Sequence, residues 1–472
     1  MLAAATIAVY ANSLGGAFVF DDITSLLAEN PTIRHLWPLF GPDGVLNPPP
    51  GGLTVSGRPL ANLSFALNYA AGRLDPAGYH VVNLAIHAAA ALVLFGLVRR
   101  TLGRWRAVGA TDRSRPAVSD AALPAWTVAL LWALHPLQTE SVTYVVQRTE
   151  SLAGLFALLT FYGFARAADD AEAPAAGFRI PKWGWKTLVV AACLAAMATK
   201  ETAAAVPLLV LVYDATFISA GYREAWRARR GTYLALAATW VLLAVLVVLN
   251  RDRAGTAGFD AAVSPWRYAV TQCQAIGRYV QLAVWPHPLV IDRGYALVPR
   301  LALVWPQALL IILALVATGW AVVRRSPLGF AGAWFFALLA PSSSFVPVAT
   351  QTVAEHRMYL PLAALVAVVV LAAWRRFGRI VFPVACAVAV VGGAATVLRN
   401  GDYASAVDLW RLTTAQAPAN WRAENNLGFH LFLDEQPAAA LPHFEAAQRL
   451  APENRQVHFN IARTLVRLRR LP

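Results

Sequence analysis

Two adjacent carboxylates stand where the first apolar segment of this sequence ends. Asp21 and Asp22 directly follow Phe18-Val19-Phe20, at the start of a long polar connection. A carboxylate held beside a hydroxyl can accept its proton, and two carboxylates together can hold a divalent cation. The alternative is a helix end marked by two solvated acids, and the pair taken alone leaves both interpretations open.

Further polar residues gather near the same predicted ends of the apolar segments. His80, Asn83 and His87 fall at positions i, i+3 and i+7, so they share one helix face. Such a face suits either a cavity or a hydrogen-bonded seam between helices. The candidates for binding a donor phosphate or sugar are Arg58, His80, His135, Glu140, Arg148, Lys200, Glu201, Glu355, His356 and Arg357.

Each of these candidates also has a simpler explanation. Arginine grips phosphate through its planar fork, but Arg357 could equally snorkel to a membrane interface. Lys200 and Glu201 could form an ion pair that caps a turn. The argument for a site is therefore convergence, since acids, histidines and arginines collect on one predicted face of the membrane.

Composition defines the elements that must position these residues. Hydrophobic residues make up 58% of the 472 and charged residues only 14%, with a mean hydropathy of +0.51. Soluble domains are typically about half apolar and about one quarter charged. The net charge is +14, but the arginines lie in short loops between apolar runs. This placement favours a membrane protein over a nucleic-acid-binding protein.

The sequence predicts an all-α polytopic membrane protein with about eleven transmembrane helices. The basic residues of four connections all fall on one side if the helices cross alternately, which places the N-terminus in the cytoplasm and residues after 399 outside. These basic residues are Arg99, Arg100, Arg104, Arg106, Arg113, Arg115, Arg223, Arg227, Arg229, Arg230, Arg324, Arg325, Arg375, Arg376 and Arg379. The predicted spans are 2–19, 80–98, 122–137, 150–166, 184–199, 203–218, 232–249, 303–323, 328–345, 359–374 and 380–398.

Two domains follow from this topology. Residues 1–398 form the membrane domain, with a first outer loop at 20–79 and a second outer segment at 250–302. Residues 266–284 mix Arg and Gln with apolar positions, which favours a helix lying in the membrane interface over one that crosses. Residues 400–472 form an extracytoplasmic helical region.

That region repeats with a period of 34 residues. Ala406, Trp410 and Pro418 recur as Ala440, Phe444 and Pro452. A 34-residue period with small, aromatic and proline positions in this order is the signature of tetratricopeptide (TPR) repeats. We expect a short TPR α-solenoid.

The sequence resembles the transmembrane-and-TPR protein O-mannosyltransferases and their bacterial relatives. Six ordered segments carry the resemblance, which covers nearly the whole chain. They are Phe18-Val19-Phe20-Asp21-Asp22, Ser56-Gly57-Arg58-Pro59-Leu60, Gly78-Tyr79-His80-Val81-Val82-Asn83, His135-Pro136, Thr199-Lys200-Glu201-Thr202 and Glu355-His356-Arg357-Met358-Tyr359-Leu360-Pro361.

The resemblance implies the GT-C fold of lipid-linked sugar transferases. It implies a sugar donor on a polyprenyl-phosphate carrier, an undecaprenyl carrier in a bacterial inner membrane, and transfer to an acceptor on the extracytoplasmic face. The acidic pair after the first helix is the catalytic signature of such enzymes and corresponds to Asp21-Asp22. The repeat array is shorter than in the eukaryotic members, which transfer mannose to protein Ser or Thr.

The resulting hypothesis is inverting transfer of mannose or a similar hexose to a hydroxyl, with a protein acceptor held by the TPR region. Asp21 or Asp22 would be the base, and Arg357 or another outer cation would stabilise the leaving phosphate. No cofactor is required, although a divalent cation is compatible, and the three cysteines show no metal-binding spacing. The alternatives are a non-catalytic TPR scaffold and a secondary transporter.

Overall fold

The described elements of the computed structural model are helices. The structure describes residues 1–108, 121–169, 180–250, 258, 263–294, 297–344, 346–348 and 351–469. Arg113 and Arg115, two of the predicted cytoplasmic arginines, lie outside the described residues. The all-α prediction is confirmed for the part of the chain that the structure describes.

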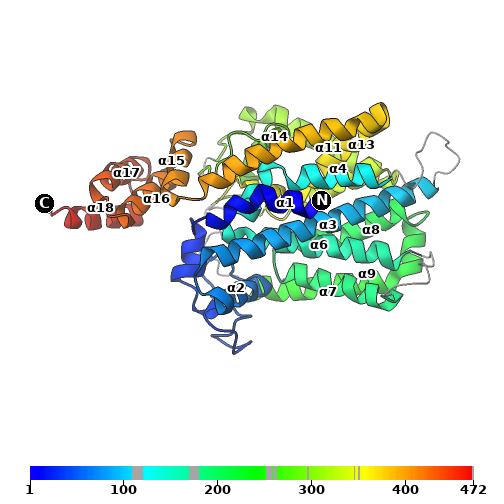
Figure 1. Cartoon of the computed structure of the whole chain (residues 1–472), viewed down its shortest axis with the longest axis horizontal. Helices are drawn as coiled ribbons and strands as arrows, with labels where there is room; N and C mark the ends of the chain where they lie inside the picture. The colour runs from blue at the N-terminus through cyan, green and yellow to red at the C-terminus, as the bar shows by residue number, and fades with distance from the viewer. Residues whose placement is uncertain are drawn as a thin grey trace.

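The helices of the membrane domain run roughly along one direction (Figure 1). Several begin with proline at the first helical position, where the missing N–H has no helical partner to lose, and Ser264 and Ser326 cap α10 and α12. Their bounds are α1 Leu2–Tyr10, α2 Pro59–Gly72, α3 Pro76–Val108, α4 Ala122–Ala133, α5 Thr139–Val142, α6 Arg148–Ala167, α7 Lys182–Met197, α8 Val206–Phe217, α9 Tyr222–Leu249, α10 Pro265–Val284, α11 Trp305–Val323, α12 Pro327–Leu339, α13 Pro361–Phe377 and α14 Val381–Asp402.

The chain is an integral membrane protein with membrane-length apolar helices. Among the described residues, four stretches are long and apolar enough to cross a membrane: Pro76–Trp105, Tyr222–Leu249, Trp305–Val323 and Pro361–Asp402. Each of the eleven predicted spans overlaps one helix, although several of these helices are short. The number of crossings therefore stays a prediction.

One end of the helical bundle carries both the first outer loop and the C-terminal helices (Figure 1). The C-terminal end of α3 lies at the opposite end of the bundle (Figure 1). This arrangement is compatible with the predicted topology, whose orientation in the cell is untested. Helix α10 buries Tyr268, Gln272 and Tyr279 against the segment that precedes α13.

Four helices follow the membrane domain, and consecutive ones pack against each other. Asn420 caps the first turn of α16 and Asn454, 34 residues later, caps α18 in the same way. Gly428 allows α16 to approach α17 closely, because a side chain there would meet the ring of Phe444. The bounds are α15 Ala406–Gln416, α16 Trp421–Leu433, α17 Pro437–Leu450 and α18 Arg455–Arg467. Their assignment as TPR repeats, and the domain boundaries, remain predictions.

A buried arginine fixes the start of α6 against α2 and α3. Arg148 donates to Asn83 Oδ1 at 2.6 Å, to the Ser64 carbonyl at 3.1 Å and to the Tyr79 carbonyl at 2.9 Å. Its guanidinium also lies over the Phe65 ring, 4.5 Å from the centroid. These donors are used by protein oxygens, so Arg148 stabilises the fold at this point.

Replacing Arg148 by methionine should destabilise the protein by about 2–3 kcal/mol, because two buried oxygens and one partly buried oxygen lose their donor while the volume is nearly kept. The thermal unfolding midpoint of the purified protein in detergent measures this effect. Arg300→Met is the matched control, since Arg300 is exposed. Equal midpoints for the two variants would contradict the structural role of Arg148.

Candidate functional site

The two adjacent aspartates have different environments. Asp22 is completely buried, and its Oδ2 accepts the Val19 N–H at 3.0 Å while its Oδ1 accepts the Val146 N–H at 2.7 Å. Burial raises the pKa of Asp22 well above its usual value, and the two backbone hydrogen bonds lower it only in part. Both oxygens of Asp22 are thus occupied in fastening the first outer loop to the turn before α6.

Asp21 presents its carboxylate differently. The side chain is partly exposed, and its Oδ2 accepts the Thr54 hydroxyl at 3.2 Å. Its backbone N–H donates to the Tyr144 hydroxyl at 2.8 Å. Burial raises the pKa of Asp21, while the positive charge of Arg422 lowers it. A partly accessible carboxylate with a raised pKa is suited to accept a proton.

The residue before this pair has an unusual backbone conformation. Phe20 has a φ of 51°, in the left-handed region that bulky residues rarely adopt. Its ring packs between Tyr144, at 6.2 Å between centroids, and Trp410 of α15, at 5.2 Å. Backbone strain of this kind persists only where the surroundings fix it, and here the two aromatic rings hold Phe20 in place directly before Asp21.

Two ion pairs lie next to the loop. Arg58 donates to Glu201 Oε2 through Nε at 3.2 Å and through Nη2 at 3.0 Å, and Lys200 pairs with Glu150 at 2.6 Å. Arg58 also donates to the Thr54 carbonyl at 2.6 Å, which links these pairs to the residue that contacts Asp21. Burial lowers the pKa of Lys200, and Glu150 counteracts the effect. The structure thus brings Arg58, Lys200 and Glu201 together.

A third pair joins α5 to the segment before α13. His356 Nδ1 lies 2.8 Å from Glu140 Oε1, and the His356 N–H donates to Oε2 at 2.9 Å. Burial raises the pKa of Glu140 to about 7 and lowers the pKa of His356 well below its usual value. The charge of Lys200 lowers the pKa of both groups, against the effect of burial at Glu140 and together with it at His356, so this pair lies within electrostatic range of the Lys200–Glu150 pair.

Glu355 and Arg357 point to different partners. Glu355 Oε1 accepts the Val290 N–H at 2.7 Å and Arg293 Nη2 at 3.4 Å, and burial raises its pKa to about 7. Arg357 donates to the Thr352 carbonyl at 3.1 Å and to the Tyr268 hydroxyl at 3.3 Å. Arg357 is therefore engaged with α10 and the segment before α13, whereas Arg422 is the arginine that acts on Asp21.

The remaining candidates lie in seams between elements. His80 Nε2 contacts the Gly16 carbonyl at 3.2 Å, and His135 Nε2 contacts the Ala283 carbonyl at 3.1 Å. His87 bonds through both ring nitrogens, to the Tyr359 hydroxyl and the Ala133 carbonyl, each at 3.0 Å. For the face of α3 that carries His80 and His87, the hydrogen-bonded seam is the arrangement that the structure shows.

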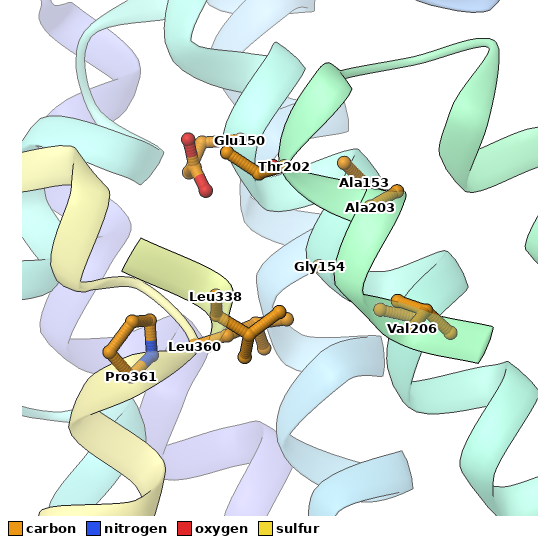
Figure 2. A pocket seen from close by; sticks show the side chains of 10 residues that line it. Glu150, Ala153, Gly154, Thr202, Ala203, Val206, Leu338, Leu360 and Pro361 are labelled. Carbon is orange, nitrogen blue, oxygen red and sulfur yellow. The ribbon is translucent and has the colours of Figure 1, made fainter. Parts of the chain in front are cut away.

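A small cavity lies beside Glu150, inside the membrane domain (Figure 2). Glu150 and Thr202 lie at one end, and Leu338 and Leu360 lie farther along it. Its volume is about 10 Å³, room for about one water molecule. Small residues form much of the remaining wall: Ala153, Gly154, Ala157 and Ala203.

Among the described residues, no group of three or more His, Cys, Asp or Glu side chains is arranged to hold a metal ion. Arg422 is the site residue that sequence reasoning missed. It falls inside the repeat region, two residues after the capping Asn420, and nothing in the spacing of that region indicates contact with the first outer loop.

The site thus belongs to a helical membrane protein with a buried cluster of acids and bases at one end of its bundle. No protein-family model matches the sequence. Protein O-mannosyl-transferase TMTC3 of Mus musculus is 25% identical across 98% of this chain and 52% of its own length. Tmtc3 of Drosophila melanogaster is 34% identical over 222 residues, which cover 44% of this chain and 23% of the relative.

The chain is a distant relative of the TMTC protein O-mannosyl-transferases over nearly its whole length, which confirms the resemblance. It spans about half the length of the mouse relative. Among solved structures, ArnT from Cupriavidus metallidurans bound to undecaprenyl phosphate aligns with 98% of this chain and 76% of its own, at 14% identity and a TM-score of 0.43. Similarity at that level does not by itself define a shared fold.

Lys200→Met should destabilise the protein by about 3 kcal/mol, because it leaves the Glu150 carboxylate buried without its partner. The double variant Lys200→Met/Glu150→Gln should recover most of that loss. Thermal unfolding of the three proteins measures the coupling. Arg467→Met, which removes one partner of an exposed pair with Glu435, is the control and should have little effect. Additive losses in the double variant would show that the pair is not coupled.

Proposed function

We propose that this chain is a membrane glycosyltransferase of GT-C type. It would transfer mannose or a similar hexose from a polyprenyl-phosphate carrier to a hydroxyl, such as a protein Ser or Thr, on the extracytoplasmic face. The single observation that carries the proposal is the presentation of Asp21: Asp22 and the strained Phe20 fix the loop, while the Asp21 side chain is partly exposed and its carboxylate accepts the Thr54 hydroxyl. The distant relationship to protein O-mannosyl-transferases supports it.

The proposed reaction is a single displacement. Asp21 accepts the proton of the acceptor hydroxyl as the hydroxyl oxygen bonds to the anomeric carbon of the sugar. The bond between that carbon and the carrier phosphate breaks, and the phosphate leaves as an anion. One displacement inverts the anomeric configuration. Lys200 and Arg58 are the cations that we assign to the phosphate, because both lie in the cluster linked to Thr54 and Asp21.

The pocket of Figure 2 suggests where the carrier lies. Its polar end holds Glu150, the partner of Lys200, and the rest is lined by apolar side chains from α6, α8, α12 and the start of α13. A prenyl chain is apolar and a phosphate is charged, so a slot with this polarity fits the two parts of the carrier. Because the slot holds about one water, Leu338 and Leu360 would have to move to admit the chain.

The neighbouring pair of Glu140 and His356 is our assignment for the sugar hydroxyls. A carboxylate with a pKa of about 7 and a neutral imidazole together offer donors and acceptors. The C-terminal helices would hold an acceptor polypeptide near Asp21. The displacement as written needs no metal, since Lys200 and Arg58 supply the positive charge.

Asp21→Asn should lower kcat by at least about 100-fold with little change in KM, because it removes the base and keeps the shape of the side chain. Transfer from polyprenyl-phosphate mannose by the full chain in lipid nanodiscs measures this. Asp22→Asn should lower the thermal unfolding midpoint, because an amide nitrogen faces one of two backbone N–H groups. Asp43→Asn, in an exposed part of the same loop, is the control. Wild-type transfer rates in Asp21→Asn would refute the assignment of Asp21 as the base, whereas absence of transfer by the wild-type protein would favour a non-catalytic scaffold.

Ala203→Leu should raise the KM for the lipid-linked donor by about tenfold, because the larger side chain enters the slot that we assign to the prenyl chain. Ala204→Leu adds the same volume one position along, at a residue that does not line the slot. The ratio of KM values for long and short prenyl chains distinguishes the two variants. An Ala203→Leu protein that folds and uses both donors as well as wild type would show that the chain lies elsewhere.

A further inference from the structure

The start of α16 is bound directly to the second outer segment. Asp292 accepts Arg422 Nε on Oδ2 at 2.7 Å and Arg422 Nη2 on Oδ1 at 2.6 Å. The side chain of Asn420 donates to the Asp292 carbonyl at 2.9 Å and to Oδ2 at 3.2 Å. The Arg422 side chain is 12% exposed and that of Asp292 only 1%. This ion pair is therefore largely shielded from water. Opposite charges attract each other more strongly in such a protein interior than they do in water.

The same arginine reaches the loop that carries Asp21. Its guanidinium lies over the Phe20 ring, 5.3 Å from the centroid. Phe20 also packs edge-on against Trp410, and the Ala17 N–H donates to the Tyr403 carbonyl at 3.0 Å. Residues of the C-terminal helices and of the first outer loop share one hydrophobic cluster. The C-terminal helices thus form part of the wall around the candidate site.

We infer that Arg422 is a positioning residue of the transferase: held by Asp292, it fixes the Phe20–Asp21 loop and places a positive charge beside the Asp21 carboxylate. The inference rests on the proposed function, because it assigns Asp21 the role of base. It gives the C-terminal helices a part in the reaction besides holding an acceptor.

The charges around Asp21 predict the direction in which the pH dependence of the rate should shift when Arg422 or Asp292 is replaced. Arg422 from α16 lowers the pKa of Asp21, whereas burial and the negative charge of Asp292 raise it. Tyr144 and Thr54 face the carboxyl group with hydroxyls, and Asp22 is the adjacent acid. A carboxyl group acts as a base only when ionised, so the acidic limb of the rate follows the pKa of Asp21. Loss of the Arg422 charge should move that limb to higher pH, and loss of the Asp292 charge should move it to lower pH.

The test is the pH profile of kcat for the full chain in lipid nanodiscs, with polyprenyl-phosphate mannose as donor. The loss of kcat in Arg422→Gln should be about tenfold larger at acidic pH than at the higher pH values where the rate no longer changes with pH. Arg422→Lys should recover most of that loss, and Asp292→Asn should shift the limb in the opposite direction. Arg411→Gln is the matched control, since Arg411 forms an exposed pair with Asp408 on the neighbouring helix. Its profile should follow that of wild type.

Two results would overturn the inference. One is a profile of Arg422→Gln parallel to wild type at every pH. The other is an equal, pH-independent loss in Arg422→Gln and Asp292→Asn, which is what a purely structural contact would give. Asp292→Asn also keeps the test decisive if Arg422→Gln fails to fold. Failure of the proposed function is a separate result, seen when wild type transfers no sugar or when Asp21→Asn transfers as fast as wild type.

Discussion

The buried carboxyl group of Asp22 joins the first outer loop to the turn before α6. Asp22 and Val146, which it binds in that turn, lie 124 positions apart in the chain. The carboxyl group accepts N–H groups from both segments, at Val19 and at Val146. A buried backbone N–H without an acceptor is costly, and the two oxygens of Asp22 supply one acceptor to each of these N–H groups. The direction of the neighbouring Asp21 depends on this fastening, because the two residues are consecutive and the conformation of Phe20 is set by the same loop.

Charges in the candidate site are arranged in pairs from different parts of the chain. Lys200 pairs with Glu150 and Arg293 with Glu355, and the imidazole of His356 hydrogen-bonds to Glu140. An isolated charge at this degree of burial would be strongly unfavourable, and each ion pair offsets part of that penalty while keeping a polar surface inside an apolar bundle. A polar site of this kind also suits a phosphate that leaves as an anion, since Lys200 and Arg58 are already held in position before any ligand binds.

The sequence predicts the helices better than the site, for a physical reason. A long apolar run indicates a membrane helix without reference to its neighbours, and each of the eleven predicted ranges overlaps a helix, but several of these helices are shorter than a span. The site depends on tertiary contacts. Asp21 and Asp22 are indistinguishable in the sequence, because what separates them is two backbone N–H groups from distant segments. Histidine and arginine are common in active sites, which makes His87 and Arg148 candidates. In the structure, however, their polar atoms form hydrogen bonds between helices.

Arg422 illustrates the same limit and its consequence. A repeat helix is predicted from its period, which says nothing about the face that docks on another domain. In the structure that docking face and the wall around Asp21 are one surface, because Phe20 packs on Trp410 while Arg422 binds Asp292. A short stack of helices is only marginally stable alone, so its packing on the outer loops contributes to its own stability. The contacts that hold the C-terminal helices in place therefore also set the geometry and the charge beside Asp21, and a change in one affects the other.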